Sequence, residues 1–244
     1  FKRHSPNANQ IGQNPLPMLS VHGLTCVRGE RRLFAGLDFA VDSGEWLHVR
    51  GENGAGKTSL LRMLVGLMPA AEGEIRWQGQ TTHELGEDFR RELLFLGHHG
   101  AVKEELTALE NLQSASALDG EVLAEREALT ALHRFGLRGR EELPVRFLSA
   151  GQKRRVLLAR LVTKKAKLWV LDEPFTALDV KAVDMLSALI GEHLAAGGIA
   201  ILTSHQSMPI AGGRVLVLGP SGAVAAPGAA SACAPAAAAS EAAS

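Results

Sequence analysis

The sequence predicts an α/β fold built around a mostly parallel sheet, and three observations support this class. Short apolar runs alternate with segments of helical periodicity along most of the chain, as expected for strand–helix–strand units. A glycine-rich loop at 51–58 joins a predicted strand to a predicted helix. The apolar run at 167–171 ends in two adjacent carboxylates, Asp172 and Glu173, at the strand end where parallel sheets place their ligands.

The first half of the chain predicts strands around one helix. Residues 21–26 and 32–41 are rich in apolar side chains and indicate two antiparallel strands joined by a turn. Trp46–Arg50 predicts the strand that enters the glycine-rich loop, and residues 59–67, with apolar side chains at helical spacing, predict the helix that leaves it. Residues 73–77 alternate in polarity and predict an edge strand.

The second half alternates between helical and strand patterns. The apolar run Leu93–Leu96 predicts a buried strand because it is too short for a helix. Leucines at helical spacing over 107–146 predict an inserted helical lobe, and Ser149 is expected to N-cap the next helix. The remaining expected elements are the buried strand 167–171, a helix at 180–194, the buried strand Ile199–Thr203, and a strand at 214–218 that closes the sheet.

We expect three segments along the 244 residues. Residues 1–17 are polar and without periodicity, which predicts a disordered leader with a natural start at Met18. The folded body is expected at 18–220, with the helical lobe at about 107–163. Residues 221–244 are rich in Ala, Gly, Pro and Ser and predict a low-complexity tail, because they bury too little apolar surface to offset the entropy of ordering.

Charge and cysteine content argue against several classes of protein. The 26 basic and 26 acidic residues give a formal net charge of zero, so no basic excess indicates a nucleic acid, and we expect no nucleic-acid partner. Cys26 and Cys233 lie far apart, which suits a reducing cytoplasm rather than a disulfide framework or a metal site. Outside the alanine-rich tail, no apolar run is long enough to span a membrane.

The loop at 51–58 fits the P-loop pattern G-x-x-x-x-G-K-[ST] at every fixed position. Its glycines let successive backbone N–H groups point at a phosphate, and the helix N-terminus adds partial positive charge beneath the same anion. Lys57 is expected to reach the β- and γ-phosphates, and the Thr58 hydroxyl to hold Mg²⁺. A glycine turn that carries a lysine by chance would not explain the flanking strand and helix. We therefore predict that ATP and Mg²⁺ bind at Gly51, Glu52, Asn53, Gly54, Ala55, Gly56, Lys57, Thr58 and Ser59.

The carboxylate pair predicts hydrolysis. Asp172 is expected to contact Mg²⁺ through its second shell or a water, and Glu173 to polarise the attacking water as general base. The alternative is a solvated acidic turn, which is disfavoured because an apolar run precedes the pair and Pro174 follows it.

A second anion site is predicted upstream of the carboxylates, at Leu148-Ser149-Ala150-Gly151-Gln152. A helix N-terminus with a serine hydroxyl and unencumbered backbone N–H groups attracts anions. The basic residues that follow, Lys153, Arg154 and Arg155, are expected to form a solvated face rather than to bind phosphate directly.

Together these features resemble the nucleotide-binding subunits of ATP-binding-cassette (ABC) transporters over about 18–219. Residues 148–152 resemble the family signature LSGGQ with alanine at position 150, residues 177–179 resemble the D-loop, and His205 resembles the switch histidine that contacts the γ-phosphate. The resemblance implies the ABC type of P-loop NTPase fold, with a mostly parallel sheet, an antiparallel β subdomain and an inserted helical lobe. It also implies ATP hydrolysis. The site residues it implies are Glu173, His205 and Lys57 for catalysis, Ser149, Gly151 and Gln152 for ATP binding, and Thr58 and Asp172 for the metal.

Within that family the details resemble the ATPase subunits of haem exporters that serve cytochrome c maturation. The shared features are Ser-Leu-Leu-Arg after the P-loop, Gly-Glu-Ile-Arg-Trp at 73–77, and most specifically the run from Leu-Gly-His-His at 96–99 to the helix start at 103–112. This resemblance implies haem export or haem handling for cytochrome c biogenesis. It also implies a peripheral position on the cytoplasmic face of the bacterial inner membrane.

Two positions depart from the wider ABC pattern. His98, followed by His99, stands where a Mg²⁺-contacting glutamine is usual, and imidazole is a poor ligand for this hard cation. The metal contact is then mediated by water, made by His99 instead, or absent. We favour a role for this loop as a joint between the helical lobe and a membrane subunit. Adenine commonly stacks on an aromatic residue before the P-loop strand, but the chain has no tyrosine. Arg28, whose guanidinium is able to stack on a base, and Phe34 are the rival candidates.

The chain has one P-loop and one signature, so the resemblance implies two copies arranged head to tail with two ATP molecules between them. Each copy would offer Ser149 and Gly151 to the γ-phosphate held by the other. Integral membrane subunits are expected as separate polypeptides. An ABC ATPase that exports another substrate is the main alternative. A soluble ABC ATPase is disfavoured because there is no second cassette or long coiled coil. Glu173 argues against a subunit that does not hydrolyse ATP. Residues 148–152 and His205 argue against a P-loop kinase.

Overall fold

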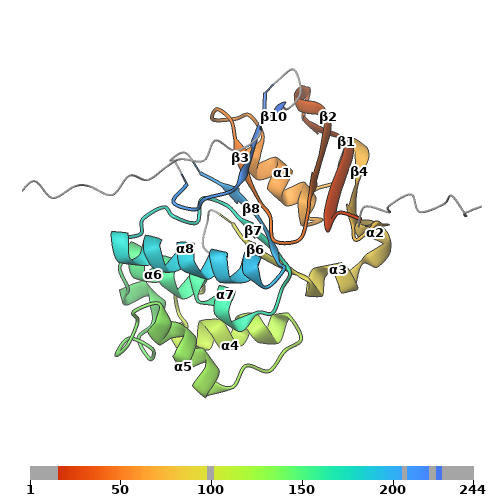
Figure 1. Cartoon of the computed structure of the whole chain (residues 1–244). Helices are drawn as coiled ribbons and strands as arrows, with labels where there is room; N and C mark the ends of the chain where they lie inside the picture. Colours follow the sequence, from red (N-terminus) through yellow and green to blue (C-terminus); the bar gives the residue numbers. More distant parts are fainter. Residues whose placement is uncertain (1–15, 98–101, 205–207, 220–223, 227–244) are drawn as a thin grey trace, which may run out of the picture.

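The computed structural model describes residues 16–97, 102–204, 208–219 and 224–226. Its elements form two sheets and a group of helices (Figure 1). In chain order they are β1 (Leu19–Arg28), β2 (Arg31–Val41), β3 (Trp46–Arg50), α1 (Lys57–Leu64), β4 (Glu72–Trp77), β5 (Gln80–Thr81), α2 (Thr82–Leu85), α3 (Glu87–Arg91), β6 (Leu93–Leu96), α4 (Ala108–Leu118), α5 (Glu125–Arg134), the 3-10 helix η1 (Val145–Phe147), α6 (Ala150–Leu158), α7 (Arg160–Thr163), β7 (Leu168–Leu171), α8 (Val180–Ala195), β8 (Ile199–Thr203), β9 (Arg214–Val217) and β10 (Val224–Ala226).

The larger sheet has the strand order β10-β9-β3-β8-β7-β6. All its neighbouring strands are parallel except β10, which is antiparallel to β9. The predicted mostly parallel sheet is thus confirmed. The prediction that 214–218 closes the sheet is wrong, because Val224–Ala226 pairs with Val215–Val217 and adds one more strand. This strand comes from the alanine-rich segment, where we expected no folded element.

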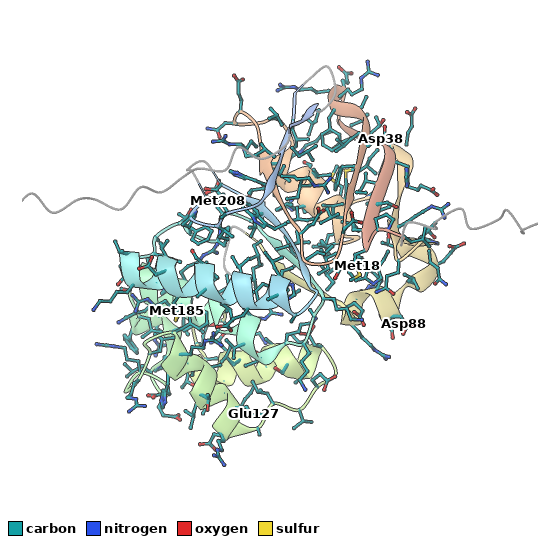
Figure 2. All side chains as sticks on the ribbon, in the orientation of Figure 1. Met18, Asp38, Asp88, Glu127, Met185 and Met208 are labelled. Atoms are coloured by element: carbon teal, nitrogen blue, oxygen red, sulfur yellow. The ribbon has the colours of Figure 1, made fainter. Side chains whose placement is uncertain are left out.

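The two faces of this sheet are covered by different helices. Successive strand residues point to opposite faces, so on β7 Leu168 and Val170 join one core while Trp169 and Leu171 join the other. The first core contains the apolar side chains of α1 and of the antiparallel sheet. The second contains those of α4 to α8. Side chains lie on both sides of the sheet, including that of Met185 on α8 (Figure 2). The helix after the P-loop and the helix after Ser149 therefore lie on opposite faces.

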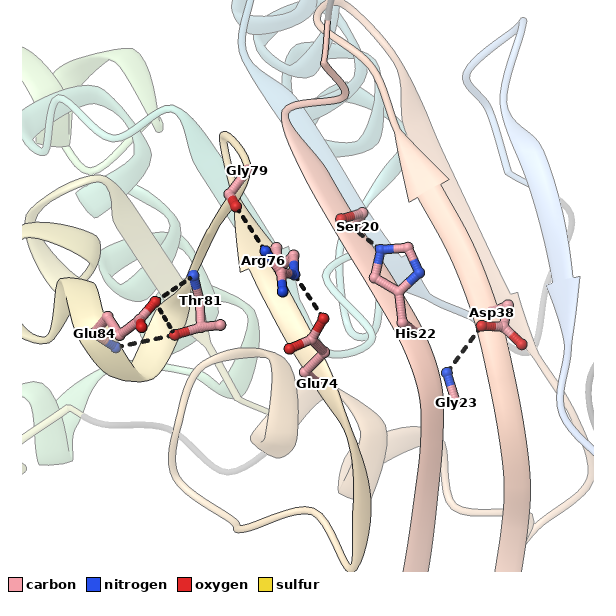
Figure 3. Close-up of polar contacts among 9 residues, drawn as sticks. All are labelled: Ser20, His22, Gly23, Asp38, Glu74, Arg76, Gly79, Thr81 and Glu84. Carbon is pink, nitrogen blue, oxygen red and sulfur yellow. Dashed lines mark hydrogen bonds and ion pairs between the residues drawn. The ribbon is translucent and has the colours of Figure 1, made fainter.

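The smaller sheet is antiparallel, with the order β2-β1-β4-β5. Polar contacts tie its strands and turns together (Figure 3): Arg76 bonds Glu74 at 2.6 Å and the Gly79 carbonyl at 3.0 Å, and the Gly23 N–H donates to Asp38 at 2.8 Å. The prediction that 73–77 is an edge strand is wrong at its C-terminal end. The chain reverses there, and β5 pairs with the last residues of β4.

Capping boxes start several of the helices. Ser149 caps α6, as expected: its hydroxyl accepts from the Gln152 N–H, while the Gln152 side chain accepts from the Ser149 N–H. Thr107 and Glu110 do the same for α4. α2 and α3 were not expected, because helices of four and five residues carry too little periodicity to be read. In the described ranges, no helix combines the length and apolar character needed to cross a bilayer.

Candidate nucleotide site

The P-loop is held in its curled form by close backbone packing. Gly56 has φ 101°, and a Cβ there would lie 3.2 Å from the ring of Phe34. Gly51 has φ 153°, and a Cβ there would lie 3.0 Å from the Leu218 carbonyl oxygen. Since L side chains rarely adopt such angles, and neither position has room for one, both must be glycine. The loop therefore packs against Phe34 of β2 and against Leu218, which follows β9.

Lys57 lies inside this loop. Its ammonium donates to the carbonyl oxygens of Gly51, at 2.7 Å, and Glu52, at 3.1 Å, and the residue is only 9% exposed. A lysine ammonium carries three donors. The structure thus places a desolvated cation at the centre of the loop that was predicted to hold the triphosphate.

A hydroxyl–carboxylate network joins the P-loop to the ends of two strands. The Thr58 hydroxyl donates to Asp172 Oδ2 at 3.0 Å, and the Thr203 hydroxyl donates to Asp172 Oδ1 at 2.6 Å. The same Thr203 oxygen accepts from the Glu173 N–H at 2.9 Å. Asp172 is 3% exposed and Thr203 fully buried. Residues from three distant parts of the sequence therefore converge, and the predicted site residues Thr58, Asp172 and Glu173 are among them. Thr203 was not among the predicted site residues.

Glu173 lies where the backbone changes direction after β7. Its φ is +50°, a left-handed angle that a non-glycine residue seldom adopts. This turn takes the chain out of β7 directly after Asp172. The Thr176 hydroxyl donates to Glu173 Oε2 at 3.3 Å. The two adjacent residues consequently differ in burial: Asp172 is buried, and Glu173 is half-buried at the strand end.

The predicted signature does not approach the P-loop of the same chain. Ser149 and Ala150 are exposed at the start of α6, on the other face of the sheet from α1. A Cβ on Gly151 would lie 3.1 Å from the Ala177 carbonyl oxygen, and Ala177 itself has φ +62°. The signature therefore packs on residues 177–179 and leaves Ser149 open to the outside.

The expectation that Lys153, Arg154 and Arg155 form a solvated face is wrong for both arginines. Arg154 donates from Nη2 to the backbone oxygens of Asp172, at 3.1 Å, and Glu173, at 2.7 Å. Arg155 pairs with Asp179 at 2.6 Å. Burial lowers the pKa of Arg154, while the nearby Asp172 and Glu173 charges act in the opposite direction. Helical spacing alone did not show which face of α6 meets the carboxyl end of β7.

The other predicted site residues have varied positions. Arg28 is exposed at the end of β1. Phe34 is fully buried beneath Gly56, so it cannot stack on a base. The Ser59 hydroxyl lies in hydrogen-bonding contact with the buried Cys26 thiol, whose pKa is raised chiefly by burial. His205, like His98 and His99, lies outside the described residues.

One buried histidine was overlooked by the sequence reading. His48, on the strand that enters the P-loop, is 4% exposed and its Nε2 lies 3.3 Å from the Ser204 carbonyl oxygen. Burial lowers the pKa of this imidazole. The apolar neighbours of His48 in the sequence identified the strand but gave no sign of its contact with the residue that precedes His205.

A P-loop, a carboxylate pair at a strand end and a helical lobe with an exposed, serine-capped helix N-terminus at Ser149 define an ABC-type ATPase. A family model described as "ABC transporter" matches residues 34–176. A solved structure titled "Structure of ATP binding subunit of ABC transporter" superposes with a TM-score of 0.76 at 26% identity, covering 86% of this chain and 90% of that one.

Curated relatives narrow the class. A protein of Dechloromonas aromatica (strain RCB), described as "Cytochrome c biogenesis ATP-binding export protein CcmA", is 58% identical over 198 residues, 81% of this chain and 97% of the relative. The protein of the same description from Escherichia coli (strain K12) is 48% identical over 81% of this chain and 94% of the relative. The chain belongs to this family of ABC-type ATP-binding export proteins.

Proposed function

We propose that two copies of this chain bind and hydrolyse ATP at two shared sites and so drive an export step in cytochrome c biogenesis, with haem as the transported species. The observation that carries the ATPase part is the network that joins Thr58, Asp172, Thr203 and the backbone of Glu173. The names of the relatives support the export part. The assignment of haem as the transported species comes from the sequence resemblance.

The donors at the strand end fit a magnesium ion. Thr58 Oγ1 and Asp172 Oδ2 lie 3.0 Å apart. Mg²⁺ prefers oxygen ligands, and in phosphate-binding sites it usually takes only a few of them from the protein. On this proposal the Thr58 hydroxyl would hold the ion, with Asp172 contacting it through water. When bound, the ion would neutralise charge on the phosphates of the substrate.

The residues of one chain divide the chemistry of hydrolysis. Lys57 would exchange its contacts with Gly51 and Glu52 for the β- and γ-phosphates, which bear far more negative charge than a carbonyl oxygen. Glu173 would accept a proton from the attacking water. His205 would contact the γ-phosphate, and Arg28 would stack on the adenine ring.

The arrangement of the helices supports two copies sharing the sites. Because α1 and α6 cover opposite faces of the sheet, Ser149 cannot complete the ATP site of its own chain. In a twofold head-to-tail pair, Ser149, Gly151 and Gln152 of each copy would close on the ATP held by the other. Separate integral membrane subunits would receive the movement of this pair. The chain would act at the cytoplasmic face of the inner membrane.

Complementation tests this function. In a strain lacking its own protein of this family, the wild-type chain should restore c-type cytochromes, detected by their covalently bound haem in gels. Glu173→Gln should not restore them. Asp184→Asn, an equivalent change at an exposed carboxylate on α8, should behave as the wild type. A chain that hydrolyses ATP and associates with the membrane but leaves cytochrome c assembly unrestored would contradict the proposed export step.

A further inference from the structure

Arg154 projects from the signature helix into the carboxyl ends of two strands. Its Nη2 donates to the Asp172 and Glu173 carbonyl oxygens at 3.1 and 2.7 Å, and its Nη1 to the Gly97 carbonyl oxygen at 3.5 Å. Gly97 follows β6, and the other two residues follow β7. One guanidinium thus joins the exits of neighbouring parallel strands to a helix on one face of the sheet.

These bonds hold the backbone on both sides of Glu173. The Glu173 backbone is constrained at its N–H by Thr203, at 2.9 Å, and at its carbonyl by Arg154, at 2.7 Å. Both bonds flank a residue in the left-handed region, with φ +50°. A strained non-glycine angle persists only where its surroundings over-determine it. The Thr176 N–H also donates to the Glu173 carbonyl, at 3.2 Å. Arg154 is therefore one of the contacts that fix the direction in which the Glu173 carboxylate leaves the strand.

The same helix is tied to the segment that follows the carboxylates. Arg155, the next residue, pairs with Asp179 at 2.6 Å, and Gly151 packs on the Ala177 carbonyl oxygen. By contrast, Lys153 pairs with Glu104, in the loop before α4, at 2.5 Å. A displacement of α6 must consequently displace the backbone on both sides of Glu173.

We propose that Arg154 is a positioning residue that couples the signature helix to the general base of its own chain. The inference rests on the proposed function, in which Ser149 at the start of α6 contacts the ATP bound by the partner copy. Closure of Ser149 on that ATP sets α6 in place, and Arg154 transmits this position to the backbone of Glu173. Each copy thus aligns its own base when its signature engages the other copy's nucleotide.

Three variants test the proposal in the full-length chain. Arg154→Gln should lower kcat by about tenfold or more while the ATP dissociation constant changes by less than about threefold, because the phosphate-binding residues are untouched. Arg154→Lys keeps the charge and a shorter donor and should recover part of the rate. Lys153→Gln, the matched control on the same helix, should retain the wild-type kcat. Thermal melting of each variant identifies any that fails to fold.

A mixed pair then separates positioning from a local effect on the signature. Two differently tagged copies are purified together, one of them carrying Glu173→Gln so that only the other copy has an active base. Arg154→Gln placed in the copy with the active Glu173 should reduce hydrolysis strongly. The same change in the inactive copy, whose signature serves the active site, should reduce it much less.

The outcomes distinguish the positioning role of Arg154 from the proposed function. Loss of activity only when Arg154→Gln lies in the inactive copy, or a folded Arg154→Gln with wild-type kcat, would overturn the positioning role. A wild-type chain that neither hydrolyses ATP nor pairs in its presence would instead overturn the proposed function on which the inference rests.

Discussion

At the scale of the residue, the site depends on side chains that each serve two partners. Thr203 accepts from the Glu173 N–H and donates to Asp172, while Asp172 also accepts from Thr58. Asp172 and Thr203 are buried, so removing the Thr203 hydroxyl leaves both a carboxylate oxygen and an amide without this partner. The hydroxyl of Thr203 therefore supports both Asp172, the proposed metal-facing residue, and Glu173, the proposed base.

Thr203→Val tests that role. Valine has nearly the same shape but no hydroxyl, so the free energy of unfolding should fall by about 1–3 kcal/mol, and kcat should fall because Glu173 loses a constraint. Urea unfolding and ATPase assays measure the two effects. Thr203→Ser, which keeps the hydroxyl, should stay close to the wild type in both. Equal losses in the serine and valine variants would show that packing, rather than the hydrogen bonds, matters at this position.

The motif residues were predictable from the sequence and the residues that hold them were not. Lys57, Thr58 and Asp172 are recognised because their spacing within a strand–loop–helix or strand-end pattern is local. Thr203 and Arg154 both act through contacts with Asp172. Thr203 lies 31 positions after Asp172 in the sequence, and Arg154 lies 18 positions before it. A chain read without its fold gives no sign of such pairs, and Arg154 was accordingly expected in solvent.

At the scale of the element, glycine fixes how β4 crosses β1. The register between these strands shifts between His22 and Thr25, opposite Gly73, which has φ +87°. A Cβ on Gly73 would lie 2.5 Å from backbone atoms of His22 and Gly23. No side chain fits there, because real Cβ atoms do not approach backbone so closely.

Gly73→Ala should therefore separate the two strands. We expect the free energy of unfolding to drop by about 3 kcal/mol, from a left-handed angle combined with overpacking. Gly66→Ala is the control: its φ is +74°, but nothing lies within 4 Å of the added Cβ, so the loss should be limited to about 1 kcal/mol of backbone strain. Denaturant unfolding of both proteins gives the comparison. Similar losses at the two positions would show that close packing at Gly73 contributes nothing.

Element boundaries were predictable where a local pattern marks them. β3, β6 and β8 have the predicted bounds because each is a short, mainly apolar run, and α6 starts directly after Ser149, the expected N-cap. β5, α2 and β10 were missed because elements of two to four residues leave almost no pattern. β5 and β10 pair with the strands that precede them, β4 and β9.

At the scale of the whole molecule, the sheet separates the P-loop helix from the signature helix, which belong to different cores. On the proposed function, a complete ATP site therefore requires a second copy. ATP would then link the two copies, and its binding should favour the pair by mass action.

Pairing should depend on Ser149. Glu173→Gln protein, which binds ATP without consuming it, should be monomeric without nucleotide and should form pairs when ATP and Mg²⁺ are added. Adding Ser149→Arg should abolish pairing, because a long cationic side chain fills the position of the partner's phosphate. Light scattering after size-exclusion chromatography measures both. Pairing that is indifferent to ATP and to Ser149→Arg would contradict the shared site.

The most direct test of the account is ATP hydrolysis by the purified chain and by Glu173→Gln at saturating Mg²⁺ and ATP. The amide keeps the shape of the carboxylate but cannot accept a proton. We expect the variant to bind ATP with nearly unchanged affinity and to lose about 100-fold or more in kcat. Asp184→Asn, with the same chemical change far from the P-loop, should retain full activity. Near-normal turnover by Glu173→Gln would contradict the assignment of Glu173 as the base and, with it, the mechanism built on this strand end.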